Sequence, residues 1–415
     1  MTGKYQRTVT AMNLDQWRTP GIVLGCGAAI LAVSMGIRHT FGLFLPPMSM
    51  DYGWGREVFA FAIALQNLVW GLAQPVTGMI ADRFGAGKTI LVGSFLYALG
   101  LLWMAAAQTP GDLALSAGLL IGLGLSGTTF AVVFGAVSRA MPPGKRSVAM
   151  GISSAVGSLG QFAMLPGSMG LMSWVGWATT LVLFAGLALA MVPLSSALFE
   201  ERLDDGSEPH ISVRDALAEA LSHRGFWLLS LGFFVCGFQV VFIAIHLPAF
   251  LLDQNFSPAV GTTVLALIGL FNVIGTYLAG HWGGHYSKPG LLSSIYAGRA
   301  IVIAAFVYFP TTAASAYAFG IAMGLLWLST VPLTNGTVAV IFGVRNMSML
   351  GGVVFLFHQI GAFLGGWVGG YVYDQTGSYD SVWLMAIALS VIAMLLNLPI
   401  REDAVPRLKT STGAS

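Results

Sequence analysis

The chain has 415 residues, of which 56% are hydrophobic and only 9% are charged, and its formal net charge is +2. Soluble domains average about 25% charged residues, so this composition excludes an ordinary soluble enzyme and indicates an integral membrane protein. Without a basic cluster, the sequence argues against nucleic acid as a partner. The two cysteines, Cys26 and Cys236, both fall in apolar runs and are expected to be small buried hydrophobic residues rather than a disulfide.

Apolar runs of about 20 residues recur along the chain, and each is long enough to cross a bilayer as a helix. Because the runs are continuous and not short alternating segments, they favour helices over a β-barrel. We therefore predict an all-α membrane protein with twelve transmembrane helices. The predicted spans are residues 21–46, 58–80, 89–107, 113–137, 148–172, 176–198, 226–251, 259–282, 291–309, 314–336, 347–372 and 382–399.

Short connections join the predicted spans except in the middle of the chain, where a longer acidic segment separates the sixth span from the seventh. In that segment, Ser212 followed by Asp215 predicts a capped amphipathic helix lying on the surface. The predicted organisation is an N-terminal tail (1–20), a six-helix bundle (21–198), a linker (199–225), a second six-helix bundle (226–399) and a C-terminal tail (400–415).

The distribution of basic residues predicts the orientation in the membrane. If the N-terminus is placed in the cytoplasm, every lysine and arginine outside the spans falls on the cytoplasmic side except Arg56. Because basic loops stay inside, both termini are predicted to be cytoplasmic, and the first twenty residues are predicted to be a tail rather than a cleaved signal peptide. We expect a multi-pass protein surrounded by lipid in a bacterial inner membrane.

The two halves of the chain show weak internal similarity. At an offset of 202 residues, Gly78 corresponds to Gly280. At an offset of 201 residues, Gly160 corresponds to Gly361. Both offsets agree with the six-span period, so they predict two pseudo-symmetric bundles. Parallel repeats of this kind build transporters with a binding site between the halves.

Two arginines, Arg38 and Arg299, are the only formal charges inside the predicted spans. A guanidinium at the bilayer centre costs roughly 2.5–3.5 kcal/mol on insertion scales, and it cannot lose its proton. Because no Asp or Glu lies inside a span, a substrate carboxylate is the natural partner, and it would accept two parallel hydrogen bonds. The alternative is a structural side chain that reaches backbone carbonyls or the interface. For Arg299 both interpretations stay open.

The segment from Gly78 to Lys88 reads GMIADRFGAGK and ends the second predicted span. It resembles the signature loop of the major facilitator superfamily, Gly-x-x-x-Asp-Arg-x-Gly followed by basic residues. The resemblance implies that Asp82 braces the outward-open state against the start of span 11, where a helix N-terminus favours a carboxylate. The second half lacks the Asp-Arg pair, so the corresponding brace is expected to be weaker. The gating residues implied by the resemblance are Gly78, Asp82, Arg83 and Lys88.

The stretch from Arg38 to Phe44 reads RHTFGLF and resembles the first span of monocarboxylate transporters, where a basic residue precedes Ser-Phe-Gly-Val-Phe. The basic position of that family falls on His39, beside Arg38. The family's Asp-Gly-Gly-Trp signature is absent here, and its paired Asp and Arg of span 8 fall on Asn272 and Thr276. The resemblance implies an anion:proton symporter that carries monocarboxylates.

The superfamily resemblance also implies that spans 1, 2, 4, 5, 7, 8, 10 and 11 line the transport route, so polar residues on these spans are candidates for the site. His246 and His358 are the proton-coupling candidates, because imidazole titrates near neutral pH. A hydrogen-bonded structural histidine is the alternative for each. The candidate substrate-binding residues are Arg38, His39, Gln66, Gln161, His246, Asn272, Tyr277, Asn335 and His358.

We expect a secondary transporter that moves a small organic anion, with a monocarboxylate as the expected class, by alternating access. Proton symport stays open, because no buried carboxylic acid could carry the proton. Relatives work as monomers, so a monomer is expected here, without a cofactor or a metal. No nucleophile–base–acid set supports an enzyme.

Two rival functions stay open. One is a proton-driven efflux antiporter, although Gly118 stands at the arginine position of span 4 in such antiporters and residues 151–170 lack their Gly-Pro-x-x-Gly-Gly pattern. The other is a membrane-embedded sensor, which would bind its ligand without flux. An organic-phosphate exchanger is a further alternative, although it would need a second arginine in span 7, where the sequence has none.

Overall fold

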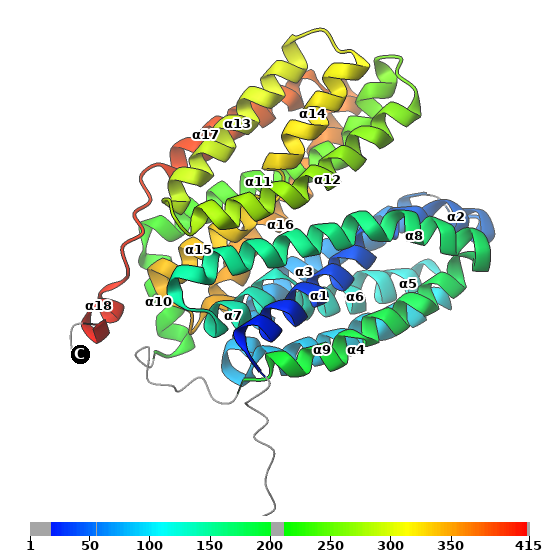
Figure 1. The fold of residues 1–415 in the computed structure, drawn as a ribbon. Coiled ribbons are helices and arrows are strands. Elements are labelled where there is room, and N and C mark those ends of the chain that lie inside the picture. Colours follow the sequence, from blue (N-terminus) through cyan, green and yellow to red (C-terminus); the bar gives the residue numbers. More distant parts are fainter. Residues whose placement is uncertain (1–17, 55, 201–210, 413–415) are drawn as a thin grey trace, which may run out of the picture.

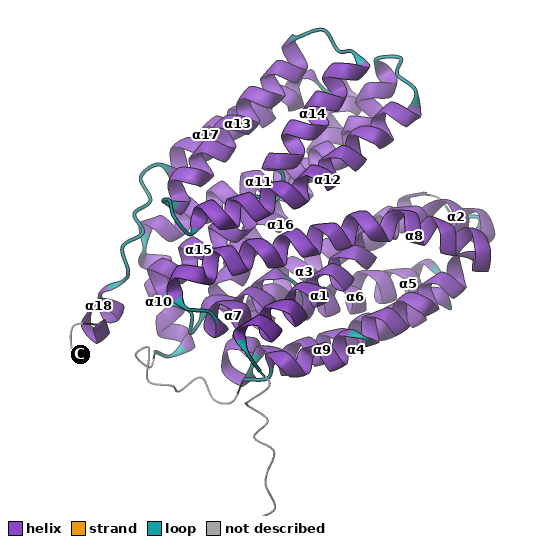
Figure 2. Cartoon of the chain, viewed as in Figure 1, coloured by secondary structure: helices purple, strands orange, loops and turns teal. Residues whose placement is uncertain are grey.

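The computed structural model describes residues 18–54, 56–200 and 211–412. These residues form helices joined by short loops, with no strand among them (Figure 2). Eleven helical stretches in this part of the chain are long and apolar enough to cross a membrane. One of them, Pro143–Leu198, has 56 residues, about twice the length of one span. It turns at Gly176, whose φ of 78° suits glycine, and so holds spans 5 and 6. The predicted twelve-helix architecture is thereby confirmed.

In the N-terminal half, span 1 consists of α1 and α2, span 4 of α5 to α7, and spans 5 and 6 of α8 and α9. The helices are α1 (Pro20–His39), α2 (Leu45–Tyr52), α3 (Arg56–Phe84), α4 (Ala86–Ala105), α5 (Pro110–Leu113), α6 (Ile121–Thr128), α7 (Phe130–Ala140), α8 (Arg146–Leu189) and α9 (Met191–Ser195). A π-helix, Ala114–Leu120, joins α5 to α6.

In the C-terminal half, span 10 consists of α14 and α15, and each other span is a single helix. The helices are α10 (Val213–Ser222), α11 (Arg224–Asp253), α12 (Pro258–Gly283), α13 (Lys288–Tyr308), α14 (Ala313–Leu326), α15 (Thr330–Phe342), α16 (Met347–Thr376), α17 (Asp380–Asn397) and α18 (Pro406–Thr412).

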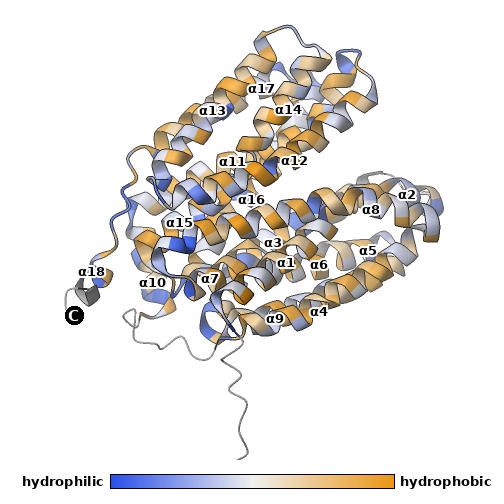
Figure 3. Ribbon diagram, in the orientation of Figure 1, coloured by the Kyte–Doolittle hydropathy of each residue, from blue (hydrophilic) through white to orange (hydrophobic). Residues whose placement is uncertain are grey.

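The two halves lie against each other at one end of the molecule and diverge toward the other (Figure 1). We call the first end the linker end, because it carries the linker helix α10 and the C-terminal helix α18, and the other the far end. Apolar residues predominate along the helices, and hydrophilic residues gather toward the ends and loops (Figure 3). This distribution is the one that a bilayer requires.

The predicted repeat is visible in how the helices pack. Gly160 of α8 lies so close to α1 that a Cβ built on it would be 2.3 Å from the carbonyl oxygen of Ala32. Its predicted equivalent, Gly361 of α16, lies against α11, where the same atom would be 2.0 Å from the carbonyl oxygen of Phe234. Equivalent glycines therefore bring equivalent helix pairs into backbone contact in both halves.

The linker contains the predicted amphipathic helix, α10. The Ser212 side chain caps it by accepting a hydrogen bond of 3.1 Å from the backbone N–H of Asp215. Ala216 and Ala220 are its buried residues. Part of the predicted linker, residues 201–210, lies outside the described residues, as do residues 1–17 and 413–415 of the predicted tails.

Spans 4 and 10 were predicted as continuous apolar runs, but each is broken near its middle. Span 4 breaks at Thr129, which has an extended backbone between α6 and α7. Span 10 breaks after Leu326, between α14 and α15. Hydroxyl side chains near both breaks compete for backbone hydrogen bonds, and Pro332 removes a backbone donor from the first turn of α15.

Candidate functional site

Arg38 lies in the last turn of α1 and points toward α3. Its Nη2 donates a hydrogen bond to Oδ1 of Asn67, and its guanidinium carbon lies 5.0 Å from the ring centroid of Trp70. Its Nε is buried and has no hydrogen-bond partner among the described residues. A planar cation is thus held in place by a neutral amide and an aromatic face, while at least one donor is left unused.

Asn67 lies at the contact between the two halves, which its backbone carbonyl makes. The Gln359 side chain of α16 donates a hydrogen bond of 3.1 Å from Nε2 to the backbone carbonyl of Asn67. Nearby, a Cβ built on Gly71 of α3 would lie 2.7 Å from Cβ of Gln359. Arg38 is therefore linked to the C-terminal half through one residue of α3.

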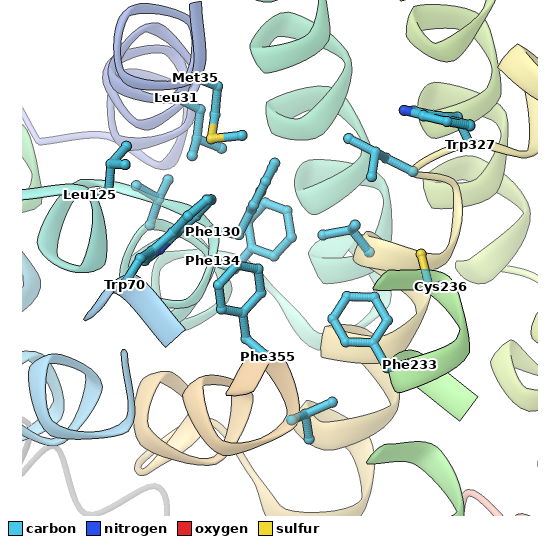
Figure 4. Packing of buried hydrophobic residues seen from close by; sticks show 14 of the residues in the cluster. Leu31, Met35, Trp70, Leu125, Phe130, Phe134, Phe233, Cys236, Trp327 and Phe355 are labelled. Carbon is cyan, nitrogen blue, oxygen red and sulfur yellow. The ribbon is translucent and has the colours of Figure 1, made fainter. Parts of the chain in front are cut away.

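A group of buried aromatic residues, which we call the aromatic layer, lies between the two halves: Trp70, Phe130, Phe134, Phe233 and Phe355 (Figure 4). The rings of Trp70 and Phe355 are 4.8 Å apart, and those of Phe130 and Phe134 are 5.5 Å apart. Trp70 lies about one turn nearer the linker end than the Asn67 amide. The layer therefore separates the Arg38 side chain from the linker end with apolar rings.

His358 lies beside the aromatic layer. Its ring stacks on Phe355 at 5.4 Å and packs against Phe233 at 4.8 Å. Its Nδ1 lies 3.3 Å from Oε1 of Gln359. A chain of contacts therefore runs from His358 through Gln359 and Asn67 to Arg38, so two of the predicted site residues, Arg38 and His358, are linked indirectly.

Gln161 is a second donor without a partner. It lies on α8, next to Gly160, and its buried Nε2 has no hydrogen-bond partner among the described residues. A Cβ built on Gly36 of α1 would lie 3.0 Å from the Gly160 carbonyl oxygen, so Gln161 and Arg38 sit at the same helix contact. An unpaired buried donor costs about 1–3 kcal/mol, which a bound acceptor would offset.

His39 turns away from this contact. Its side chain is exposed, and its Nδ1 lies 3.1 Å from the carbonyl oxygen of Met35 on its own helix. Arg38, and not His39, is thus the basic residue of span 1 that reaches the other helices.

Four other predicted site residues lie elsewhere. Gln66 is fully buried and donates to the Ala117 carbonyl, within the π-helix of span 4. Asn335 donates to the Val331 carbonyl of its own helix, and Tyr277 is 45% exposed. Asn272 bridges the halves by donating to Oγ of Ser158 at 2.9 Å, and it also accepts from the backbone N–H of Leu328.

His246 also lies apart from Arg38, inside the C-terminal half. Its Nε2 is 2.9 Å from the carbonyl oxygen of Gly366, and its Nδ1 is 3.3 Å from the hydroxyl of Tyr379. Because the carbonyl can only accept, Nε2 carries the proton and Nδ1 accepts from the tyrosine hydroxyl. Both ring nitrogens therefore have partners within one half.

Arg299 of α13 is completely buried, and its side chain is hydrogen-bonded to the backbone at the break in span 10. Its guanidinium donates to the carbonyl oxygens of Leu326 and Trp327 and, at 3.1 Å, to Oε1 of Gln239. These carbonyls have lost their helical partners at the break. Arg299 thus replaces backbone hydrogen bonds, as irregular backbone at membrane depth requires.

The predicted gating residues Gly78 and Asp82 contact the C-terminal half at the linker end. The Asp82 carboxylate accepts from the backbone N–H groups of Ser348 and Met349, at 3.2 and 2.7 Å, in the first turn of α16. A Cβ built on Gly78 would lie 2.2 Å from the carbonyl oxygen of Ser348. Arg83 and Lys88, in contrast, are exposed.

Two residues that the sequence did not single out complete this contact. Arg139 of α7 donates to Asp82 at 2.9 Å and makes two hydrogen bonds, of 2.8 and 3.0 Å, to the Glu200 carboxylate. In the sequence, both are charged residues near the ends of predicted spans. Their pairing depends on the ends of spans 4 and 6 meeting beside span 2, which the sequence does not reveal.

The corresponding loop of the second half is built differently. A Cβ on Gly280 of α12 would lie 2.3 Å from Cα of Gly151 on α8, so glycine again allows the halves to touch. In place of an aspartate brace, Lys288 pairs at 3.0 Å with Glu402 of the C-terminal tail. Lys288 also lines a pocket of about 440 Å³, together with Ser147, Gly283 and Leu408 among others.

Chemically, the residues around Arg38 offer a fixed positive charge, unused hydrogen-bond donors and an aromatic wall. Such a group can hold a carboxylate or a similar small anion. The described residues contain no cluster of His, Cys, Asp or Glu that could bind a metal.

Comparison with known proteins agrees with the fold. The family model described as Major Facilitator Superfamily matches residues 24–366. Mouse Monocarboxylate transporter 11 is 26% identical over 395 residues, which cover 91% of this chain and 87% of that protein. The uncharacterised MFS-type transporter YcxA of Bacillus subtilis (strain 168) is 23% identical over 395 residues, covering 91% and 93%. The crystal structure of the Escherichia coli fucose:proton symporter has a TM-score of 0.69 at 17% identity, covering 91% and 97%.

Proposed function

The chain belongs to the Major Facilitator Superfamily and is a membrane transporter, not an enzyme, and we propose that it moves a small organic anion, a monocarboxylate, by alternating access. The observation that carries the proposal is the Arg38 side chain, a partly buried cation whose buried Nε lacks a hydrogen-bond partner among the described residues. A substrate carboxylate would fit this guanidinium and the unpaired amide of Gln161. The curated relatives named monocarboxylate transporters support the same substrate class.

The arrangement of the halves supports a transport cycle in which the linker end opens and closes. In this structure the linker end is held by the Asp82 carboxylate and by glycine contacts at Gly78 and Gly280. We propose that the linker end faces the cytoplasm of a bacterial cell, as its basic residues require. The structure then represents the outward-facing state, and the four residues of the signature loop act in gating.

We propose that anion binding at Arg38 is linked to movement of the halves through the bond from Gln359 to Asn67. A bound anion would neutralise the guanidinium and weaken its hydrogen bond to the Asn67 side chain. Because Asn67 also accepts from Gln359, this change would alter the contact between α3 and α16. The remaining expectations, a lipid-embedded monomer and coupling to protons, form part of the same proposal.

Uptake into proteoliposomes tests the proposal. Purified protein is reconstituted, and uptake of labelled L-lactate and pyruvate is measured with and without an imposed pH gradient. We expect saturable uptake that is lost in Arg38→Ala and weakened in Arg38→Lys, because a lysine cannot form two parallel hydrogen bonds. His39→Ala, which changes the neighbouring exposed residue, serves as the control.

The outcomes separate the rivals. Normal uptake by Arg38→Ala would remove the anion site from the proposal. Export of lipophilic cations without anion flux would favour the efflux antiporter. Saturable binding without flux would favour the sensor.

A further inference from the structure

The pocket of about 440 Å³ at the linker end has no residue in common with the site around Arg38. Its lining comes from the start of span 5 and the loop before it, from the ends of spans 8 and 10, from the start of span 9, and from the C-terminal tail. Pro143, Gly144 and Gly284 line it and are exposed, so the pocket is accessible from solvent. Its volume lies within the range of about 300–1,000 Å³ that is typical of small-molecule sites.

Two glycines leave the space that the pocket occupies. A Cβ built on Gly283 of α12 would lie 2.5 Å from Oγ of Ser147 and 3.7 Å from Cγ of Lys288. A Cβ built on Gly336 of α15 would lie 3.0 Å from Cδ of Lys288 and 3.4 Å from the terminal methyl group of Met150. The serine hydroxyl, the lysine stem and the methionine methyl group therefore surround one small space.

Ser147 brings an unused hydrogen-bonding group to this space. Its side chain is buried, and its Oγ has no hydrogen-bond partner among the described residues. The hydroxyl of Ser153, on the same helix, donates instead to the Ala149 carbonyl at 3.0 Å. An unpaired buried polar group is unfavourable, so an acceptor on a bound ligand would supply the hydrogen bond that Ser147 lacks.

The polar part of the lining is positively charged. Arg146 and Lys288 line the pocket, and no carboxylate of the described residues does. Beside it, the Glu402 carboxylate accepts hydrogen bonds from the backbone N–H and from Nζ of Lys288, each of 3.0 Å. The start of α13 therefore already binds one carboxylate. An ammonium group has three donors, of which Glu402 accepts one, so Lys288 can bind a second anion.

Much of the remaining lining is apolar. It includes Met150 of α8, Ala339 and Val340 of α15, and Leu408 of α18. A ligand that matches this lining carries one anionic group for the polar part and an apolar chain for the rest.

We propose that the pocket is a second, regulatory site that binds a carboxylate with a short apolar chain. The carboxylate accepts hydrogen bonds from Oγ of Ser147 and Nζ of Lys288, and the chain lies against Met150 and Leu408. Ser147 belongs to the N-terminal half and Lys288 to the C-terminal half, so both contacts exist only while the linker end is closed.

A ligand that binds only one conformation stabilises that conformation. The bound carboxylate therefore holds the linker end closed. Its effect on transport rests on the proposed alternating access, in which the linker end must open in every cycle. The ligand then inhibits the transporter from the linker end.

Hydrogen exchange measures whether the ligand holds the linker end closed. Purified protein is titrated with n-hexanoate, and hydrogen–deuterium exchange is followed by mass spectrometry on peptides covering residues 344–352, which contain the amides bound by Asp82. A ligand that binds only the closed state slows this exchange by about tenfold at ten times its Kd. n-Hexylammonium, which has the opposite charge, should leave the exchange unchanged.

Two variants alter the pocket itself. Ser147→Ala removes the unpaired hydroxyl and should raise the Kd for hexanoate about tenfold or more. Gly336→Ala places a methyl group against the flexible ends of Lys288 and Met150, so it should raise the Kd by reducing the space. Ser153→Ala, which changes a hydroxyl bonded within the same helix, is the matched control and should keep the wild-type Kd.

Arg38→Ala separates the pocket from the proposed transport site, and its response to hexanoate should equal that of the wild type. Protection that is lost in Arg38→Ala and kept in Ser147→Ala would overturn the proposal, because hexanoate would then bind at the transport site. Absence of protection in the wild type, or equal protection by hexylammonium, would also overturn it. Wild-type protein without lactate flux refutes the proposed function, whereas its protection by hexanoate would still support the pocket.

Discussion

The carboxylate of Asp82, at the end of α3, accepts a hydrogen bond of 2.7 Å from the backbone N–H of Met349, in the first turn of α16. The two residues belong to different halves of the molecule. A carboxylate at a helix N-terminus is favoured by the helix dipole and by unpaired N–H groups. The Asp82 carboxylate is therefore one of the contacts that hold the linker end closed.

The first prediction concerns that side chain. Asp82→Asn removes the charge but keeps the size, so the amides of Ser348 and Met349 lose a charged acceptor worth about 1.5–3 kcal/mol per bond. We expect hydrogen exchange of these two amides to accelerate by about 10–100-fold. Hydrogen–deuterium exchange with mass spectrometry on peptides covering residues 344–352 measures the effect. Arg83→Gln, at the exposed neighbouring position, should leave it unchanged, and equal protection in Asp82→Asn would contradict the brace.

The second prediction concerns the contact between Gly151 and Gly280. A methyl group at residue 280 would overlap the Gly151 backbone, so Gly280→Ala should destabilise the closed linker end by about 1–3 kcal/mol. Gly269→Ala is the matched control, because it lies on the same helix and its added Cβ would meet nothing within 4 Å. Thermal unfolding and lactate uptake should change in the first variant only. Equal behaviour of the two would show that the close approach is unimportant.

The third prediction contrasts the two arginines inside the spans. Arg299→Ala leaves the carbonyls of Leu326 and Trp327 without partners, at about 1–3 kcal/mol each, so the protein should unfold at a lower temperature. Arg38→Ala removes a side chain with an unused donor, so it should abolish uptake while changing the unfolding temperature little. Thermal unfolding and proteoliposome uptake, measured on both variants, give the comparison. A stable but inactive Arg299→Ala would instead place that residue in the transport chemistry.

The fourth prediction separates two glutamines that are alike in sequence. Gln66 donates to the Ala117 carbonyl at 2.8 Å, whereas the Nε2 of Gln161 is a buried donor without a partner. Gln66→Leu should therefore lower thermal stability by about 1 kcal/mol and leave the KM for lactate unchanged. Gln161→Leu should raise that KM. If the two effects are reversed, the site lies around Gln66 instead.

The sequence predicted those features that depend on residues close together in the chain, and it missed those that depend on contacts between distant residues. The Ser212 cap was correctly predicted, because capping depends on neighbours three residues apart. The breaks in spans 4 and 10 were missed, because they persist only where distant side chains satisfy the freed backbone. Gln74, for example, donates to the Ser126 carbonyl across 52 residues of sequence. In the sequence, nothing distinguishes Asn67 and Gln359 from other polar residues within the spans, and the hydrogen bond between them joins positions 292 residues apart.

The sequence by itself determined the membrane class, the twelve spans and the isolation of Arg38, because a bilayer demands long apolar runs and makes every buried charge conspicuous. The tertiary structure alone decided which polar groups face one another. It turned Arg38 toward Asn67 and His39 away from it, and it brought the Arg299 guanidinium to the backbone carbonyls at the break in span 10. Such contacts depend on helix rotation and on the packing of distant segments, which hydrophobic patterns constrain only weakly.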